Sequence, residues 1–239
     1  EVVLKAGVPR PELWREMEAL QAYAGRGAVH LLFADPERGV LLLERVRPGT
    51  QLLQVADDGL ATSIAAGMMR RLWRPLPTEH SFRPVTEWAA GLSRLRENYA
   101  GGTGPFPAGL VTAAESIFAE LLASAAPPVL IHGDLHHENI LRSGREAWLA
   151  IDPKGMAGEP AYEVGAWMRN PLSLPDWPDL KKVSARRADQ LAAELDLERE
   201  RIMGYSMAQA VLSAWWSLEE SGRGWAPWLA VAETLLALL

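Results

Sequence analysis

The chain has 239 residues and no cysteine, which excludes disulfides, thiolate metal sites and a cysteine nucleophile. Its 30 acidic and 24 basic residues give a net charge of −6, and no basic face of the kind that binds nucleic acid is visible. No apolar run approaches the ~18 residues that a membrane span needs. We therefore expect a cytoplasmic monomer with a small-molecule partner, because a reducing compartment suits the lack of cysteine and an acidic balance suits a cationic ligand.

The N-terminal part of the chain predicts a small β-rich region. We expect a strand at residues 1–5, a helix from Pro9 to about Tyr23, and a hairpin whose strands are 28–34 and 40–45. The hairpin strands flank a turn that contains proline and glycine. Because the chain begins without methionine and its first residues have the pattern of a strand interior, we expect further residues upstream.

Arg47-Pro48-Gly49 interrupts this pattern and is the candidate linker. The predicted domains are therefore residues 1–47, a small β-rich lobe, and residues 48–239, a larger helical lobe. Alanine- and leucine-rich stretches of the larger lobe predict helices, interrupted only by two short strands. The predicted helices are residues 56–75, 85–99, 109–125, 185–195, 199–220 and 225–239.

The two short apolar strands, at 128–131 and 147–151, enclose a dense group of polar side chains. Asp134 is followed by Asn139, and Asp152 comes directly after the second strand. Phosphoryl transfer from Mg-ATP needs one carboxylate that orients and deprotonates the acceptor hydroxyl, and an amide oxygen and a second carboxylate that hold magnesium. Two buried strands around a polar loop would put these groups on one wall of a cleft. We therefore predict ATP and Mg²⁺ as cofactors, Asp134 as the catalytic base, and Asn139 and Asp152 as metal ligands.

The histidines of the same loop offer a rival interpretation. His132, His136 and His137 resemble part of a zinc cluster in a metallo-hydrolase, which completes its shell with histidines from distant loops. No histidine follows His137, and only His30 and His80 precede the loop. We therefore expect no functional zinc. We expect His132 to be a buried group that shapes the loop, and His136 to do the same or to contact substrate.

A lysine and a glutamate near the N-terminus form a candidate cation pair. Lys5 lies on the first predicted strand and Glu16 on the following helix, which is how kinase-like folds present a cation to the α- and β-phosphates of a nucleotide. The alternative is a surface lysine beside a solvated helix charge. Glu12 and Glu18 are neighbouring candidates for the partner.

The strand that runs into the linker is a candidate adenine site. A strand crossing between two lobes offers backbone N–H and C=O groups to a base edge, so we expect the backbone around Glu44 to Val46 to bind the nucleotide. An ordinary hairpin strand is the alternative.

Acidic side chains in the larger lobe are candidate ligands for a cationic substrate. A solvated helix face is the plainer interpretation of these charges. The tryptophans at 215 and 216 are likewise more readily explained as core than as a ligand stack. The candidate substrate residues are Glu159, Glu163, Glu219 and Glu220.

Several stretches together resemble one known family along nearly the whole chain. They are residues 25–32, 41–44, 132–140, 148–153, 158–159 and 212–215. The family is that of the aminoglycoside/hydroxyurea antibiotic resistance kinases, and within it the streptomycin 6-phosphotransferases. The polar loop alone is shared by many small-molecule kinases, whereas its form here together with Asp152-Pro153 is much narrower.

The resemblance implies an α+β, protein-kinase-like two-lobed fold. A small β-rich N-terminal lobe, incomplete in this sequence and represented by residues 1–47, would bind nucleotide. A large, mainly helical C-terminal lobe would carry the catalytic loop and the substrate site. The implied reaction is ATP-dependent O-phosphorylation of a hydroxyl on a small cationic antibiotic, with streptomycin the first candidate.

The resemblance also assigns roles to single residues. It matches Asp134 to the catalytic aspartate, Asn139 and Asp152 to the magnesium ligands, Lys5 to the strand lysine and Glu16 to its helix partner. Two alternatives stay open at this point: a kinase for a metabolic amino alcohol or sugar, and a catalytically silent kinase-fold binding protein. The presence of all three base and metal residues argues against the silent protein.

Overall fold

The computed structural model describes residues 1–239, which form ten short strands and nine α-helices. The strands are β1 Val2–Ala6, β2 Leu31–Asp35, β3 Val40–Glu44, β4 Pro48–Gln51, β5 Arg74–Pro75, β6 Arg83–Pro84, β7 Val129–Ile131, β8 Ile140–Ser143, β9 Trp148–Ala150 and β10 Met156–Gly158. The helices are α1 Pro11–Tyr23, α2 Asp58–Leu72, α3 Val85–Ala89, α4 Gly91–Asn98, α5 Ala108–Ala123, α6 Pro160–Met168, α7 Leu180–Leu195, α8 Arg199–Ser221 and α9 Ala226–Leu236.

The chain packs as two compact units. The first unit comprises residues 1–83 and 127–163, and the second comprises residues 84–126 and 164–239. The predicted division into lobes of residues 1–47 and 48–239 stays a prediction. None of the helices combines the length and the apolar character that crossing a bilayer requires.

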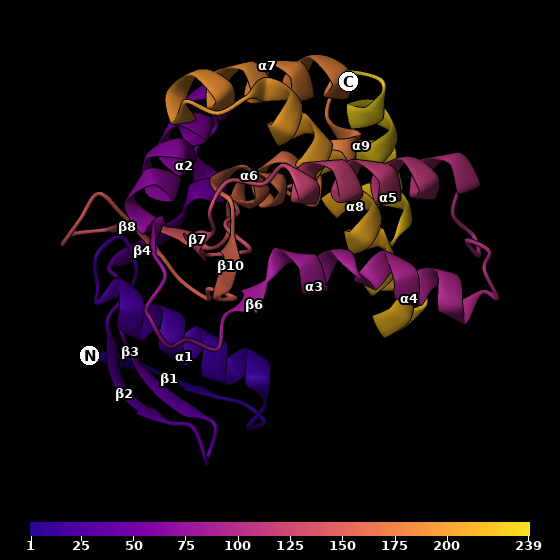
Figure 1. The fold of residues 1–239 in the computed structure, drawn as a ribbon. Helices are drawn as coiled ribbons and strands as arrows, with labels where there is room; N and C mark the ends of the chain where they lie inside the picture. Colours follow the sequence, from indigo (N-terminus) through magenta and orange to yellow (C-terminus); the bar gives the residue numbers. More distant parts are fainter. The chain divides into compact units, whose positions relative to one another are not determined.

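In the first unit, β1, β3 and β2 form an antiparallel sheet with β3 in the middle. Helix α1 lies along this sheet (Figure 1). Its buried face includes Leu13, Met17 and Leu20. Pro11 suits the first turn of α1, where a backbone N–H has no partner within the helix. Packing α1 on the sheet brings Lys5 of β1 and Glu16 of α1 together.

Two further sheets complete the first unit. Strand β8 lies between β4 and β9, and β7 and β10 are paired at the centre of a sheet with the order β5-β7-β10-β6. Helix α2 packs against β7 and β9. Its N-terminus is capped by the Asp57 carboxylate, which accepts the Leu60 N–H at 3.0 Å.

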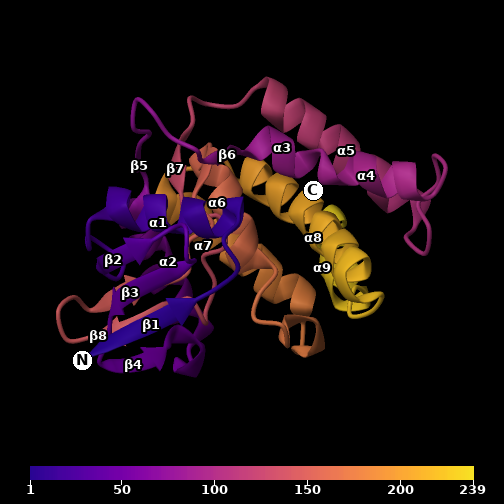
Figure 2. The same ribbon diagram turned by 90° about the horizontal axis from the view of Figure 1, so that it is seen from below.

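In the second unit, α8 is the central helix and packs against α4, α5, α7 and α9 (Figure 2). Its side chains are buried continuously from Ile202 to Trp215, as expected of a helix surrounded by others. Trp215 is 3% exposed, and the half-buried Trp216 packs edge-on against Trp88 with ring centroids 4.7 Å apart. Trp215 is therefore a core residue.

The structure adds a strand at the predicted linker and shortens one predicted strand. Pro48 and Gly49 begin β4, in which Pro48 is paired with Ser143 of β8. Ala28 forms a bridge with Ala150, and β2 begins only at Leu31. Proline and glycine at residues 48 and 49 do indicate a break in a regular pattern. The segment nevertheless forms a strand because it pairs with β8, far along the chain, at the edge of a sheet, where proline is tolerated.

The six predicted helical stretches are helical in the structure, with one interruption. Residues 85–99 divide into α3 and α4, which begins at Gly91; there an added Cβ would lie 2.5 Å from Leu212 Cδ1 of α8. Helix α6 and the short strands β5, β6, β8 and β10 were not predicted. They are too short to show a hydrophobic period.

Candidate active site

The β8–β9 hairpin places Asn139 beside Asp152. Ile140 is paired with Ala150, and the Ile151 N–H donates to the Asn139 carbonyl at 3.0 Å. Asn139 therefore enters the hairpin directly opposite the residue that precedes Asp152. Asp152 itself has a φ of 56°, a left-handed conformation that an aspartate tolerates better than most side chains and that turns the chain away from β9.

His132 shapes the loop that carries Asp134, as the sequence predicted. Its side chain is fully buried, with Nε2 2.9 Å from the Ile151 carbonyl and Nδ1 3.2 Å from the Asp134 backbone nitrogen. Nδ1 accepts the Asp134 N–H, so Nε2 carries the proton that it donates to Ile151. Burial lowers the pKa of His132 to about 4, so this neutral form persists at physiological pH.

Asn139 is tied directly to the Asp134 loop. Its Nδ2 donates to the Asp134 carbonyl at 2.9 Å and lies 3.2 Å from Nε2 of His136. The amide nitrogen is thus committed to the protein, and Oδ1 is the amide atom that remains to act as a ligand. His136 also accepts the Glu138 N–H through Nδ1 at 3.3 Å, so it contributes to the loop structure.

Lys5 joins the helix glutamate to the hairpin aspartate. Its Nζ lies 2.6 Å from Glu16 Oε1 and 3.0 Å from Asp152 Oδ1. Burial acts to lower the pKa of Lys5, but the hydrogen bond and charge of Glu16, with a contribution from Asp152, outweigh it and raise that pKa. Burial also raises the pKa of Glu16, against the opposing effect of Lys5. At 2.6 Å we take the pair to be ionised.

Glu163 of α6 binds the backbone of the same loop. Its carboxylate accepts the backbone N–H groups of His132 at 2.5 Å and Gly133 at 3.0 Å, and it is 1% exposed. Burial raises the pKa of Glu163 to about 7, although these N–H groups act in the opposite direction. The predicted substrate-facing role of Glu163 is thereby corrected: its oxygens are engaged inside the protein.

Magnesium fits the two ligand candidates. Asn139 Oδ1 and the Asp152 carboxylate, which is 47% exposed, are the hard oxygen donors that this ion prefers. No group of three or more histidine, aspartate or glutamate side chains forms a cage for a metal ion. Two protein oxygens suffice for magnesium, because it usually keeps several waters and takes further ligands from a bound phosphate.

The remaining predicted residues lie on β3, on the segment that follows it, after β10 and at the end of α8. The Glu44 side chain ends β3 and binds Arg145, and Val46 is half-buried in the segment that leads to β4. Glu159 is 6% exposed at the end of β10. Glu219 and Glu220 are exposed at the end of α8 in the second unit, where Glu219 lies 4.0 Å from Arg94.

Sequence reasoning missed two cations of the first unit. Lys154 Nζ lies 3.7 Å from Asp134 Oδ2. Arg145, at the tip of the β8–β9 hairpin, forms two hydrogen bonds to the Glu44 carboxylate, at 2.9 and 3.0 Å. The proximity of Lys154 to Asp152 in the sequence was a usable signal, whereas nothing local indicated the partner of Arg145.

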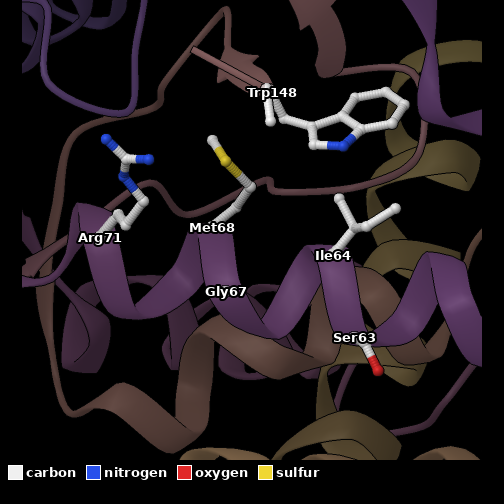
Figure 3. Close-up of a pocket in the computed structure, with 7 residues that line it drawn as sticks. Ser63, Ile64, Gly67, Met68, Arg71 and Trp148 are labelled. Atoms are coloured by element: carbon white, nitrogen blue, oxygen red, sulfur yellow. The ribbon is translucent and has the colours of Figure 1, made fainter.

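A separate hollow of about 220 Å³ lies between α2 and β9. Ile64, Met68 and Trp148 give it a largely apolar lining, and Figure 3 shows the Trp148 ring facing the α2 side chains across it. Its one charged lining residue, Arg71, is paired with Glu146 at 2.7 Å. It contains none of the candidate catalytic residues.

The fold has a clear counterpart among solved structures. A choline/ethanolamine kinase family protein from Mesorhizobium loti superposes with a TM-score of 0.70, covering 100% of this chain and 82% of that chain at 19% sequence identity. The α+β architecture is thus that of the protein-kinase-like fold, as predicted.

Sequence comparison identifies the family to which the chain belongs. The model of the aminoglycoside/hydroxyurea antibiotic resistance kinases matches residues 2–221, and the chain belongs to this family. A streptomycin 6-kinase of Streptomyces griseus is 33% identical over 97% of this chain and 76% of that protein. A hydroxyurea phosphotransferase of Kitasatospora aureofaciens is 36% identical over 99% of this chain and 68% of that protein. The protein is therefore an enzyme that phosphorylates an antibiotic.

Proposed function

We propose that the protein transfers the γ-phosphoryl group of ATP to a ring hydroxyl of streptomycin. The observation that supports this most directly is the cluster of Asp134, Asn139, Asp152 and Lys5, present in a chain with a streptomycin 6-kinase among its relatives. A streptomycin kinase of this kind would act in the cytoplasm, and we propose that it does so as a monomer.

The proposed chemistry gives each residue one task. Asp134 accepts the proton of the acceptor hydroxyl as the oxygen–phosphorus bond forms and the bond to the leaving ADP breaks. Lys5, held by Glu16, pairs with the α- and β-phosphates. Asn139 and Asp152 would hold a magnesium ion, which would supply positive charge to the phosphates.

The nucleotide base is assigned to the backbone that follows β3. Glu44 and Val46 border the connection to β4, and we propose that N–H and C=O groups between them bind the adenine edge. The Glu44 side chain itself is engaged by Arg145 and by the His30 N–H, which it accepts at 3.0 Å. Its contribution to nucleotide binding is therefore through the backbone.

Hydroxyurea is the second candidate acceptor, because the relative named for that activity is 36% identical to this chain. Streptomycin differs from it in carrying two guanidinium groups, which favour pairing with carboxylates. The acidic balance of the chain favours the cationic compound.

The test is a phosphoryl-transfer assay of the purified protein with Mg-ATP and one acceptor at a time: streptomycin, hydroxyurea or choline. We expect streptomycin to have the highest kcat/KM. We expect Asp134→Asn to remain folded and to bind nucleotide, but to lose turnover by a factor on the order of 10². Transfer to hydroxyurea or choline without transfer to streptomycin would overturn the proposed acceptor. Near-normal turnover of Asp134→Asn would overturn the proposed base.

A further inference from the structure

Lys154 is a charged residue at the centre of the candidate site to which the reaction described above gives no role. Its Nζ lies 3.7 Å from Asp134 Oδ2, on the carboxylate proposed to take the acceptor proton. The Lys154 side chain is 48% exposed and that of Asp134 is 25% exposed. Both groups can therefore be reached by a solute.

The backbone around Lys154 is fixed although its ammonium is exposed. The Lys154 N–H donates to the His132 carbonyl at 2.8 Å, which ties the residue to the catalytic loop. Gly155 follows with a φ of 63°, and a Cβ there would lie 2.7 Å from the Arg15 carbonyl oxygen of α1. Met156 then enters β10 opposite Ile131 of β7. A short segment anchored at both ends thus holds the Lys154 side chain beside Asp134.

The choice of lysine at this position is unusual for this chain. The chain has 24 lysines and arginines together, of which only four are lysines: Lys5, Lys154, Lys181 and Lys182. Two of these four lie in the candidate site, and the other two are neighbours on α7. Elsewhere the chain supplies positive charge almost entirely with arginine.

A physical difference between the two side chains explains the preference. A guanidinium beside a carboxylate forms a bidentate pair that occupies both oxygens, and Asp134 would then be blocked from the acceptor hydroxyl. An ammonium is a compact charge on a flexible stem, so it can leave the carboxylate for a phosphate oxygen. At 3.7 Å, the contact with Asp134 is an ion pair and not a short hydrogen bond.

We propose that Lys154 is a catalytic residue whose ammonium contacts the phosphoryl group during its transfer; this rests on the proposed kinase reaction. As the acceptor oxygen bonds to phosphorus and the bond to ADP breaks, negative charge is spread over the equatorial oxygens of the group in transit. The Lys154 ammonium stabilises that charge, while the acceptor proton goes to Asp134. Lys5 acts on the phosphates that remain with ADP.

The proposed contact predicts different effects on the affinity for ADP and for an ATP analogue. ADP lacks the phosphate that Lys154 contacts, whereas a non-hydrolysable ATP analogue has it. Loss of the ammonium should therefore weaken the binding of the ATP analogue but not that of ADP. A purely structural role in holding the loop would weaken both nucleotides alike.

The experiment measures kcat with streptomycin and the Kd of each magnesium nucleotide for the wild type, Lys154→Ala and Lys154→Arg. Lys181→Ala is the matched control, because it removes an exposed lysine of the second unit. For Lys154→Ala we expect kcat to fall by a factor on the order of 10². We expect its Kd for the ATP analogue to rise about tenfold, with Kd for ADP unchanged. Lys154→Arg should recover part of the analogue affinity, and Lys181→Ala should match the wild type.

Two results would overturn the proposal: a kcat of Lys154→Ala within about twofold of the wild type, or an equal loss of affinity for ADP and the analogue. A wild type that transfers phosphate to no acceptor would count against the proposed function instead. If Lys154→Ala fails to fold, Lys154→Gln, which keeps the stem and removes the charge, decides the question by the same two measurements.

Discussion

The Asp152 carboxylate is paired with Lys5 and is also a proposed ligand of the metal ion. Lys5 lies 3.0 Å from its Oδ1, and the remaining oxygen is available to a metal ion. Asn139 offers only the neutral Oδ1 of an amide, because its nitrogen is bonded to the Asp134 carbonyl. The two proposed ligands therefore differ in charge and in what else depends on them.

This difference predicts unequal effects of two substitutions. Asp152→Ala should reduce magnesium-dependent nucleotide affinity more than Asn139→Ala, because a carboxylate contributes a full charge to a hard cation and an amide only a dipole. Calorimetry with an ATP analogue, with and without magnesium, measures the effect. Small and equal changes for both variants would remove the two residues from the metal site.

Glu163 makes the stability of the protein depend on pH. Its folded-state pKa of about 7 lies above the ordinary value of 4.5, because burial disfavours the charged form. The folded state therefore holds a proton that the unfolded state has lost between these two values. The resulting stabilisation is complete below pH 4.5 and is lost as the pH rises through 7.

We therefore predict that Glu163→Gln, which cannot ionise, removes this dependence. Between pH 5.5 and 8.0 the wild type should lose about 2 kcal/mol of unfolding free energy relative to the variant. Urea unfolding of both proteins at the two pH values gives the difference. A constant difference between the proteins would show that the carboxyl group has the same pKa in both states, and a change of opposite sign would show a lowered pKa.

At the scale of elements, the β8–β9 hairpin connects the proposed metal ligands to the proposed adenine site. Its strands lead from Asn139 and to Asp152, and its tip is tied to the segment after β3. The Gly144 N–H donates to the Arg47 carbonyl at 2.8 Å, and Arg145 donates two hydrogen bonds to the Glu44 carboxylate. The segment between Glu44 and Arg47 is thus held at both ends by one hairpin.

We predict that Arg145→Ala loosens this segment and raises the KM for ATP several-fold, with a much smaller change in kcat. Arg145→Lys should behave more like alanine than like arginine, because an ammonium cannot make the bidentate pair. Arg142→Ala is the control, since it removes an exposed arginine from the same hairpin. Steady-state kinetics with ATP varied at saturating acceptor tests this. Equal ATP KM values for Arg145→Ala and Arg142→Ala would separate the hairpin tip from nucleotide binding.

At the scale of the whole molecule, the net charge of −6 should attract a cationic acceptor. Of the four glutamates predicted to bind it, Glu219 and Glu220 are exposed, whereas Glu159 and Glu163 are buried. The exposed pair is therefore the stronger candidate for recognising the guanidinium groups of streptomycin.

We predict that replacing Glu219 and Glu220 by glutamine raises the KM for streptomycin with little change in kcat, the pattern expected when ground-state and transition-state binding are lost together. The wild-type KM should also rise with salt, because exposed charges are screened. Glu120→Gln, on the exposed side of α5, controls for a change in net charge. An unchanged KM in the double variant would exclude these glutamates from substrate binding.

The parts of the fold that were predictable have local causes. Pro11 opens α1, apolar runs mark β7 and β9, and the long α8 is mainly apolar between Ile202 and Trp215. The parts that were missed depend on distant partners. Pro48 and Gly49 look like a break in the chain, and only the presence of β8 makes them a strand.

The candidate site shows the same contrast. Asp134, Asn139 and Asp152 follow a spacing that chemistry explains, and Lys5 and Glu16 follow from a strand next to a helix. Glu163 was assigned to substrate because its position in sequence shows its charge but not its depth. Its hydrogen bonds to His132 and Gly133, about thirty residues earlier, form only when α6 packs against the loop that carries Asp134.

The hairpin tip has one more consequence, for protein engineering. A solvent-exposed turn between two short strands is normally a favoured place to insert a reporter domain or an affinity tag. Here Arg145 also donates to the Gly25 and Ala28 carbonyls, so an insertion would disturb the contacts of the tip with two other segments, residues 25–28 and 44–47. The turn at Gly222 and Gly224, where an added Cβ would meet no atom within 4 Å, is the better site for such a fusion.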